Sequence, residues 1–171
     1  QVGGRASDDF YYDLNGQQVQ CSGGYYGIHC EYNAEGQSTS LTFLDEDGHA
    51  VCISSDCAGV TYQRDGNGTV VGEQYFDTDG NPVRSSLGQY GELYQRNEQG
   101  YIGQITYLGA DGKTTPTNAG YTILKRTYHR DGTADTDMYF DANGNPKALS
   151  KGQYGIKRSG DVNLLLDKNG N

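Results

Sequence analysis

Residue types that a thick globular core depends on are scarce in this chain of 171 residues. It has no Trp, one Met and three Pro, and its hydrophobic residues amount to 34%. No apolar run approaches the roughly 20 residues of a membrane-spanning helix, and no basic-then-apolar signal segment opens the sequence. A thin, layered structure that buries tyrosine therefore fits better than a central core of Leu, Ile and Val.

Positive charge is scarce as well. Thirteen Lys and Arg stand against 22 Asp and Glu, which gives a formal net charge of −9. Nucleic acids and anionic membrane surfaces attract a basic face, so the sequence predicts no nucleic-acid partner and no membrane insertion. Because the sequence starts with Gln1 rather than Met, we expect a processed or excised piece of a longer protein.

Glycine, with 26 residues, and tyrosine, with 15, are abundant. Glycines recur every 32 residues in two interleaved series: Gly16, Gly48, Gly80, Gly112 and Gly144, and Gly36, Gly68, Gly100 and Gly132. Asp or Asn opens most of the corresponding turns, where it accepts a backbone N–H, and Gly at the fourth position tolerates a positive φ. Between turns, about eight residues make a comfortable strand. The sequence thus predicts long hairpins, such as residues 121–128 with 133–140.

The predicted fold class is all-β. We expect a repeat array of β-hairpins, a solenoid of about five 32-residue repeats over residues 10–171, as a single array. Residues 1–9 fit no repeat and are predicted to be a lead-in segment. No stretch shows a helical period. Pro82 and Pro146 lack a backbone N–H, so a strand start or a bend suits them.

Two copies of the repeat carry a resemblance to a known family. These are Tyr75–Gly80 and Tyr139–Gly144, each followed by a Gly-Gln-Tyr element that ends at Tyr90 or Tyr154. Over residues 10–171 this order resembles the choline-binding and glucan-binding cell-wall repeats of Gram-positive surface proteins, and the related repeats of large clostridial toxins. The resemblance implies a β-hairpin solenoid whose neighbouring aromatics hold choline or sugar. This chain has a longer repeat and no Trp.

The aromatic residues fall into two sets. One set shares a single repeat offset and is predicted to pack as a ladder of rings: Tyr11, Phe43, Tyr75, Tyr107 and Tyr139. The other set occurs only in odd-numbered repeats and is flanked by glycines, which leaves ring faces open: Tyr26, Tyr90 and Tyr154. We predict that Tyr26, Tyr90 and Tyr154 bind the ligand, and plain packing is the alternative reading.

The four cysteines lie in the first third of the chain and show no C-x-x-C spacing, which argues against zinc. Their even number favours disulfides and an exported protein. The pairing we predict is Cys21–Cys52 with Cys30–Cys57, because Cys21 and Cys52 lie nearly one repeat apart. Buried thiols are the alternative. The Asp-x-Asp-Gly turns lack a calcium ligand at loop position twelve, so no metal or other cofactor is expected.

No constellation for catalysis stands out. The three histidines are isolated in the sequence, and no G-x-S-x-G motif is present. The chain is therefore predicted to be a non-catalytic binding module, secreted or at the cell surface, for a glycan or cell-wall polymer. The alternative is a structural, adhesive or fibre-forming surface protein, with self-association or another surface protein as its partner. A third reading is a fragment of a toxin or enzyme whose active domain lies elsewhere.

Overall fold

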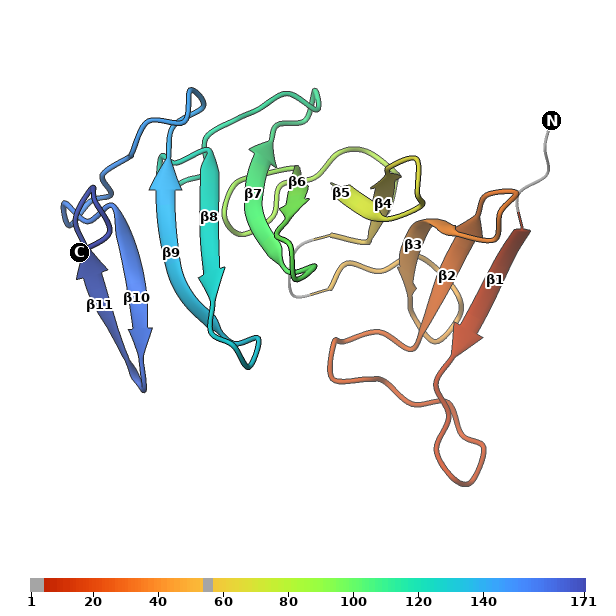
Figure 1. Cartoon of the computed structure of the whole chain (residues 1–171). Coiled ribbons are helices and arrows are strands. Elements are labelled where there is room, and N and C mark those ends of the chain that lie inside the picture. The colour runs from red at the N-terminus through yellow and green to blue at the C-terminus, as the bar shows by residue number, and fades with distance from the viewer. Residues whose placement is uncertain (1–4, 54–56) are drawn as a thin grey trace. The chain divides into compact units, whose positions relative to one another are not determined.

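A computed structural model describes residues 5–53 and 57–171 (Figure 1). The described residues form eleven β-strands and no helix, so the predicted all-β class is confirmed. The chain folds into two compact units, Gln1–Ser86 and Leu87–Asn171. Within each unit the strands pair antiparallel in chain order, as successive hairpins do.

Unit 1 contains β1 to β5, separated by alternating long links and short turns. The strands are β1 Arg5–Phe10, β2 Gly27–Tyr32, β3 Ser38–Leu44, β4 Gly59–Arg64 and β5 Val70–Phe76. Short turns close the β2–β3 and β4–β5 hairpins, each with a register shift of the β-bulge type next to the turn. Such a bulge increases the local twist of the pair.

Unit 2 contains β6 to β11. The strands are β6 Gly91–Arg96, β7 Ile102–Leu108, β8 Ile123–Tyr128, β9 Ala134–Phe140, β10 Gly155–Ser159 and β11 Val162–Leu166. The hairpin predicted over residues 121–140 is confirmed, since β8 pairs with β9 around the turn at Gly132.

The nine predicted turns are confirmed. Each of their glycines has φ between 73° and 85°, and each donates its N–H to the carbonyl of the residue three positions earlier. The opening Asp or Asn accepts further N–H groups, as Asp141 does from Asn143 and Asn145, both at 2.9 Å. In the turn that opens with His129, the acceptor is Asp131, which accepts the N–H of Thr133 at 2.9 Å. Local hydrogen bonding therefore fixes these turns.

Of the predicted ladder residues, Tyr107 and Tyr139 are buried, whereas Tyr11 is 40% exposed. In unit 2, Tyr107, Tyr121, Leu124 and Tyr139 make one buried cluster. Tyr121 lies between the two predicted ladder rings, 5.5 Å from Tyr107 and 4.7 Å from Tyr139 by ring centroids. Burial raises the pKa of the Tyr107 phenol. The ladder rings are thus joined through an interposed ring rather than stacked directly.

The prediction of a lead-in over residues 1–9 is wrong for its described part. Residues 5–10 form β1, which pairs with β2 in register from Arg5↔Tyr32 to Phe10↔Gly27. Without β1, the outer edge of β2 would present unpaired backbone groups, which sheets tend to cover. Residues 1–4 lie outside the described residues.

The predicted disulfides are not formed in the structure. Cys21, Cys30, Cys52 and Cys57 all lie within the described residues, and none is bonded to another. Cys30 lies within β2 and Cys57 just before β4, two strand spacings or about 9.5 Å apart in a sheet. Cysteines whose Cα atoms are more than ~7 Å apart are not bridged without backbone movement. Cys21 and Cys52 both lie in links outside the strands.

Candidate functional site

Tyr26, Tyr90 and Tyr154, the predicted ligand residues, are half-buried at the ends of long links. Each directly precedes the first residue of a strand, β2, β6 or β10. Within unit 2 the structure does not bring Tyr90 and Tyr154 together. Tyr26 belongs to unit 1, and in unit 2 four strand spacings, about 19 Å, separate the strands that follow Tyr90 and Tyr154.

The backbone partners of these tyrosines suggest a packing reason for their alternation. Tyr26, Tyr90 and Tyr154 donate their N–H groups to the carbonyls of leucines, at 2.8 to 2.9 Å: Leu44, Leu108 and Leu166. At the same offset in even-numbered repeats, the small Ala58 and Thr122 donate to Phe76 and Phe140. A large residue thus faces Leu and a small one faces Phe. Ligand contact by these three tyrosines stays a prediction.

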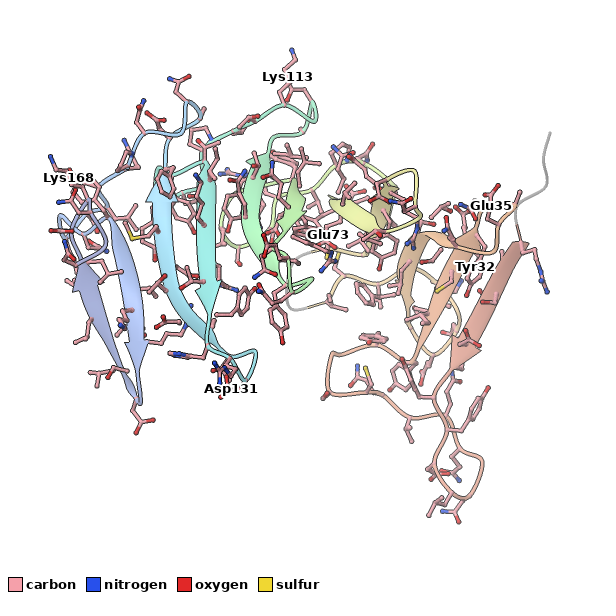
Figure 2. The ribbon with its side chains drawn as sticks, in the orientation of Figure 1. Tyr32, Glu35, Glu73, Lys113, Asp131 and Lys168 are labelled. Carbon is pink, nitrogen blue, oxygen red and sulfur yellow. The ribbon has the colours of Figure 1, made fainter. Side chains whose placement is uncertain are left out.

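A pocket of about 340 Å³ lies at the short-turn end of unit 2. We call it the turn pocket, and its lining combines two tyrosine rings with two amides, an imidazole and a guanidinium group: Asn97, Gln99, Tyr101, Tyr128, His129 and Arg130. These residues come from the β6–β7 turn and from the end of β8 with its following turn. Figure 2 shows Asp131 at that second turn, where it holds the backbone beside the pocket.

The two tyrosine rings of the turn pocket are fixed from several sides. Their centroids lie 4.9 Å apart with the planes inclined by 31°. The Tyr128 hydroxyl donates to the carbonyl of Ile102 at 2.8 Å, and the Tyr101 N–H donates to Asn97 Oδ1 at 2.9 Å. Tyr101 is nevertheless 39% exposed. The pocket therefore offers a positioned ring that solvent and a ligand can reach.

Gly132 leaves room for the far end of the Tyr101 ring. A side chain at this position would place its Cβ only 2.7 Å from the Tyr101 hydroxyl, and Gly132 also has φ of 85°. Tyr101 follows the β6–β7 turn, and Gly132 belongs to the β8–β9 turn. The Tyr101 ring therefore contacts the next hairpin, β8–β9.

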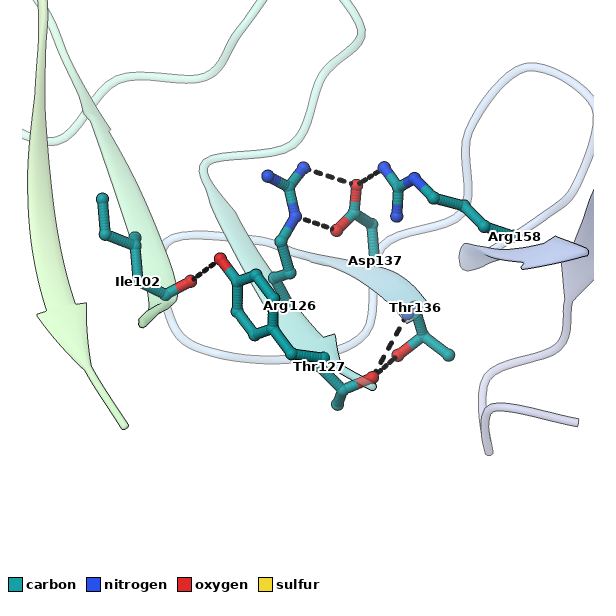
Figure 3. Close-up of polar contacts among 7 residues, drawn as sticks. Ile102, Arg126, Thr127, Thr136, Asp137 and Arg158 are labelled. Atoms are coloured by element: carbon teal, nitrogen blue, oxygen red, sulfur yellow. Dashed lines mark hydrogen bonds and ion pairs between the residues drawn. The ribbon is translucent and has the colours of Figure 1, made fainter. Parts of the chain in front are cut away.

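An ion-pair cluster supports the β8–β9 hairpin that carries half of the pocket (Figure 3). Asp137 accepts hydrogen bonds from Arg126 at 2.6 and 2.8 Å and from Arg158 at 2.7 Å. Burial opposes ionisation of Asp137, but the hydrogen bonds and charges of Arg126 and Arg158 outweigh it and hold the pKa of Asp137 below its ordinary value. The carboxylate therefore stays charged and pins β8, β9 and β10 together.

Comparison with protein-family models and with curated proteins finds no match. Over the part of the chain that the structure describes, no group of three His, Cys, Asp or Glu side chains is placed to hold a metal ion. No described helix is long and apolar enough to cross a membrane.

Sequence reasoning missed Tyr101 and Tyr128, although a signal was present. Tyr101 departs from the residues at its repeat offset, and Tyr128 departs from two of the residues at its own. The positions equivalent to Tyr101 in other repeats are Gln37, Thr69 and Thr133. The positions equivalent to Tyr128 are Tyr32, Arg64 and Arg96. Arg64 and Arg96 donate to the carbonyls of the adjacent turns, at Gly68 and Gly100. Tyr128 lacks the arginine's hydrogen bond to the adjacent turn, keeps a bond from its hydroxyl to the carbonyl of Ile102, and adds a ring, which favours a binding role.

Proposed function

We propose that this protein is a non-catalytic, extracellular binding module for a cell-wall or other extracellular glycan, and that the turn pocket is its main contact site. In this proposal the chain is a β-hairpin solenoid of about five 32-residue repeats. The regular spacing of the turn glycines and the shared hydrogen-bond pattern of their turns support it.

The observation that carries the proposal is the exposed Tyr101 ring, packed against Tyr128 and beside amide side chains. A pyranose ring has an apolar face of C–H groups and a rim of hydroxyls. An aromatic face suits the first, and Asn97 and Gln99 can exchange hydrogen bonds with the second. A volume of about 340 Å³ is at the lower end of the roughly 300–1,000 Å³ of small-molecule sites, which fits one or two sugar units.

The test is a titration of the purified chain with soluble α-glucan, β-glucan, chitin and peptidoglycan fragments. Tyr101→Ala should weaken the best binder at least fivefold, because losing a ring contact costs about 1 kcal/mol or more. Tyr12→Ala is the matched control, since Tyr12 is 60% exposed and lies outside the pocket. Equal loss in both variants, or none in Tyr101→Ala, would rule out the turn pocket.

One observation favours the structural or adhesive alternative. Strand β11 pairs only with β10 among the described strands, and three of its apolar side chains are more than half exposed: Val162 at 64%, Leu164 at 52% and Leu165 at 54%. An exposed, apolar edge strand is a template for pairing with another chain. Self-association through β11 is therefore the competing function.

A further inference from the structure

We propose that unit 1 carries a second, separate saccharide site on the face of its sheet over β2 to β5, with the ring of Phe76 as its floor. We call it the Phe76 platform, and it fits a neutral pyranose. The inference takes its ligand class from the proposed function but is built from different residues in the other unit. Its lining is His29, Glu31, Ser40, Thr42, Thr61, Phe76 and Gly80, around a shallow pocket of about 280 Å³.

Strand register places these side chains on one face. His29 lies opposite Thr42, and Thr42 lies opposite Gly59, which in turn faces Phe76. Two residues further along these strands, Glu31 lies opposite Ser40, and Ser40 lies opposite Thr61. Residues that are direct cross-strand partners point to the same side of a sheet. The pocket is therefore a product of regular pairing across four strands.

Gly59 gives the floor its shape. A Cβ at Gly59 would lie 2.4 Å from Cζ of Phe76 and 2.3 Å from the carbonyl oxygen of Leu41. The Phe76 ring can lie across the sheet at this point because Gly59 has no side chain. Phe76 is only partly buried, so its outer face is available to a C–H face of a sugar.

The rim of the platform is polar and held in place. Ser40 Oγ donates to Glu31 Oε2 at 3.0 Å, and His29 Nδ1 pairs with Asp8 Oδ1 at 2.5 Å. The hydroxyls of Thr42 and Thr61 complete the rim. Hydroxyl, carboxylate and imidazole groups beside a ring are the donors and acceptors that sugar hydroxyls need.

At the equivalent position in unit 2 the aromatic ring, Phe140, is covered by a side chain. There Ile123 replaces Gly59 opposite Phe140, and Lys125 replaces Thr61. The Lys125 ammonium covers the Phe140 ring, with Nζ 4.7 Å from the ring centroid. Such a cation–π contact occupies the ring face that a sugar would use. Unit 1 has Thr61 at this position, which leaves Phe76 uncovered.

The lining also selects the charge of the ligand. Its lining residues include no Lys or Arg, and they include the carboxylate of Glu31. An anionic sugar would meet that carboxylate without a fixed cation to offset it. A neutral hexose polymer is therefore the ligand that the platform fits.

The experiment uses the full chain and calorimetric titration with four neutral probes: maltohexaose, isomaltohexaose, cellohexaose and chitohexaose. Thr61→Lys places a lysine over Phe76 as in unit 2, at an exposed position where the fold has an equivalent. Thr61→Ser is its matched control, and the melting temperature checks the fold of both. We expect two binding events per wild-type chain, one after Thr61→Lys, one after Tyr101→Ala, and none in the double variant.

The outcomes separate the two sites. If the wild type binds once, and Tyr101→Ala alone abolishes it while Thr61→Lys has no effect, the turn pocket stands and the platform is overturned. If Thr61→Lys weakens binding at least fivefold while Tyr101→Ala does nothing, the platform stands and the turn pocket fails. If the wild type binds none of the four probes, the platform is overturned as a neutral-sugar site, and charged cell-wall fragments remain to test the turn pocket.

Discussion

Asp137 and Arg126 face each other across the β8–β9 pair and share two hydrogen bonds, at 2.6 and 2.8 Å. The positions equivalent to Arg126 are Cys30, Tyr62 and Tyr94 in the earlier repeats and Arg158 in the next one, so the cationic residues at this position are confined to the last two repeats. Asp137 is 3% exposed, and it sits close to the tyrosine cluster, where its charge opposes ionisation of Tyr121 and Tyr139. Because Asp137 is both charged and buried, the stability of the β8–β9 hairpin depends on its ion pairs with Arg126 and Arg158.

Replacing the acid should therefore destabilise unit 2. Asp137→Asn removes the charge that holds Arg126 and Arg158, and breaking a buried pair by removing one partner costs about 3 kcal/mol. Urea denaturation should show the loss, with Asp161→Asn as an exposed control that changes little. A variant as stable as the wild type would show that the pair contributes nothing net.

The same carboxylate predicts a dependence of stability on pH. Because the pKa of Asp137 is lowered in the folded state, its contribution is fully present above the ordinary pKa of Asp, near 4. The contribution is lost as the pH falls below that value and passes through the lowered pKa. Wild type should lose more stability between pH 5 and about 2 than Asp137→Asn does, measured by urea midpoints at each pH. Equal losses of stability in the wild type and in Asp137→Asn would show that other groups cause the acid sensitivity.

Two tyrosine substitutions separate core from surface. Tyr107 is 3% exposed, so Tyr107→Ala should cost about 3 kcal/mol or more and lower the melting temperature clearly. Tyr90 is half-buried, and Tyr90→Ala should lower it much less. The sequence-based prediction for Tyr90 is supported if Tyr90→Ala also weakens glycan binding, and it fails if only the melting temperature changes.

The cysteines give a chemical test of the structure. Under non-reducing denaturing conditions all four thiols should react with a thiol reagent, and in the folded protein the exposed Cys52 should react first. Buried Cys30, 7% exposed, should react only as the protein unfolds. An intact mass lower by the hydrogens of one or two disulfides would contradict the four free thiols.

Strand β11 tests the structural alternative. Leu164→Lys places a charge on its exposed edge, and charged residues are a common protection of edge strands. If the chain self-associates through β11, light scattering should show a larger mass for the wild type than for Leu164→Lys at the same concentration. Tyr12→Ala serves as the control. A monomer in all three would remove β11 as an association site.

Several features of the fold followed from the sequence because their causes are local. A turn such as Asp141–Gly144 is set by a side chain accepting nearby N–H groups and by a glycine at positive φ. These groups lie within a few residues of one another, so their spacing shows where chain reversals fall. The hairpin strands between them, such as β8 and β9, followed from the same spacing.

Other features were decided only by tertiary structure, because they depend on how far apart strands lie and where the links return. Cys21 and Cys52 are almost one repeat apart in sequence, yet both lie in links outside the strands, and the structure leaves both thiols unbonded. Tyr121 enters the core because its link brings it between Tyr107 and Tyr139. Whether an aromatic ring is accessible depends on the side chain on the neighbouring strand. Lys125 lies over the Phe140 ring, whereas the shorter Thr61 leaves the Phe76 ring accessible. Sequence spacing specifies the turns, whereas cross-strand neighbours decide which side chains a ligand can reach.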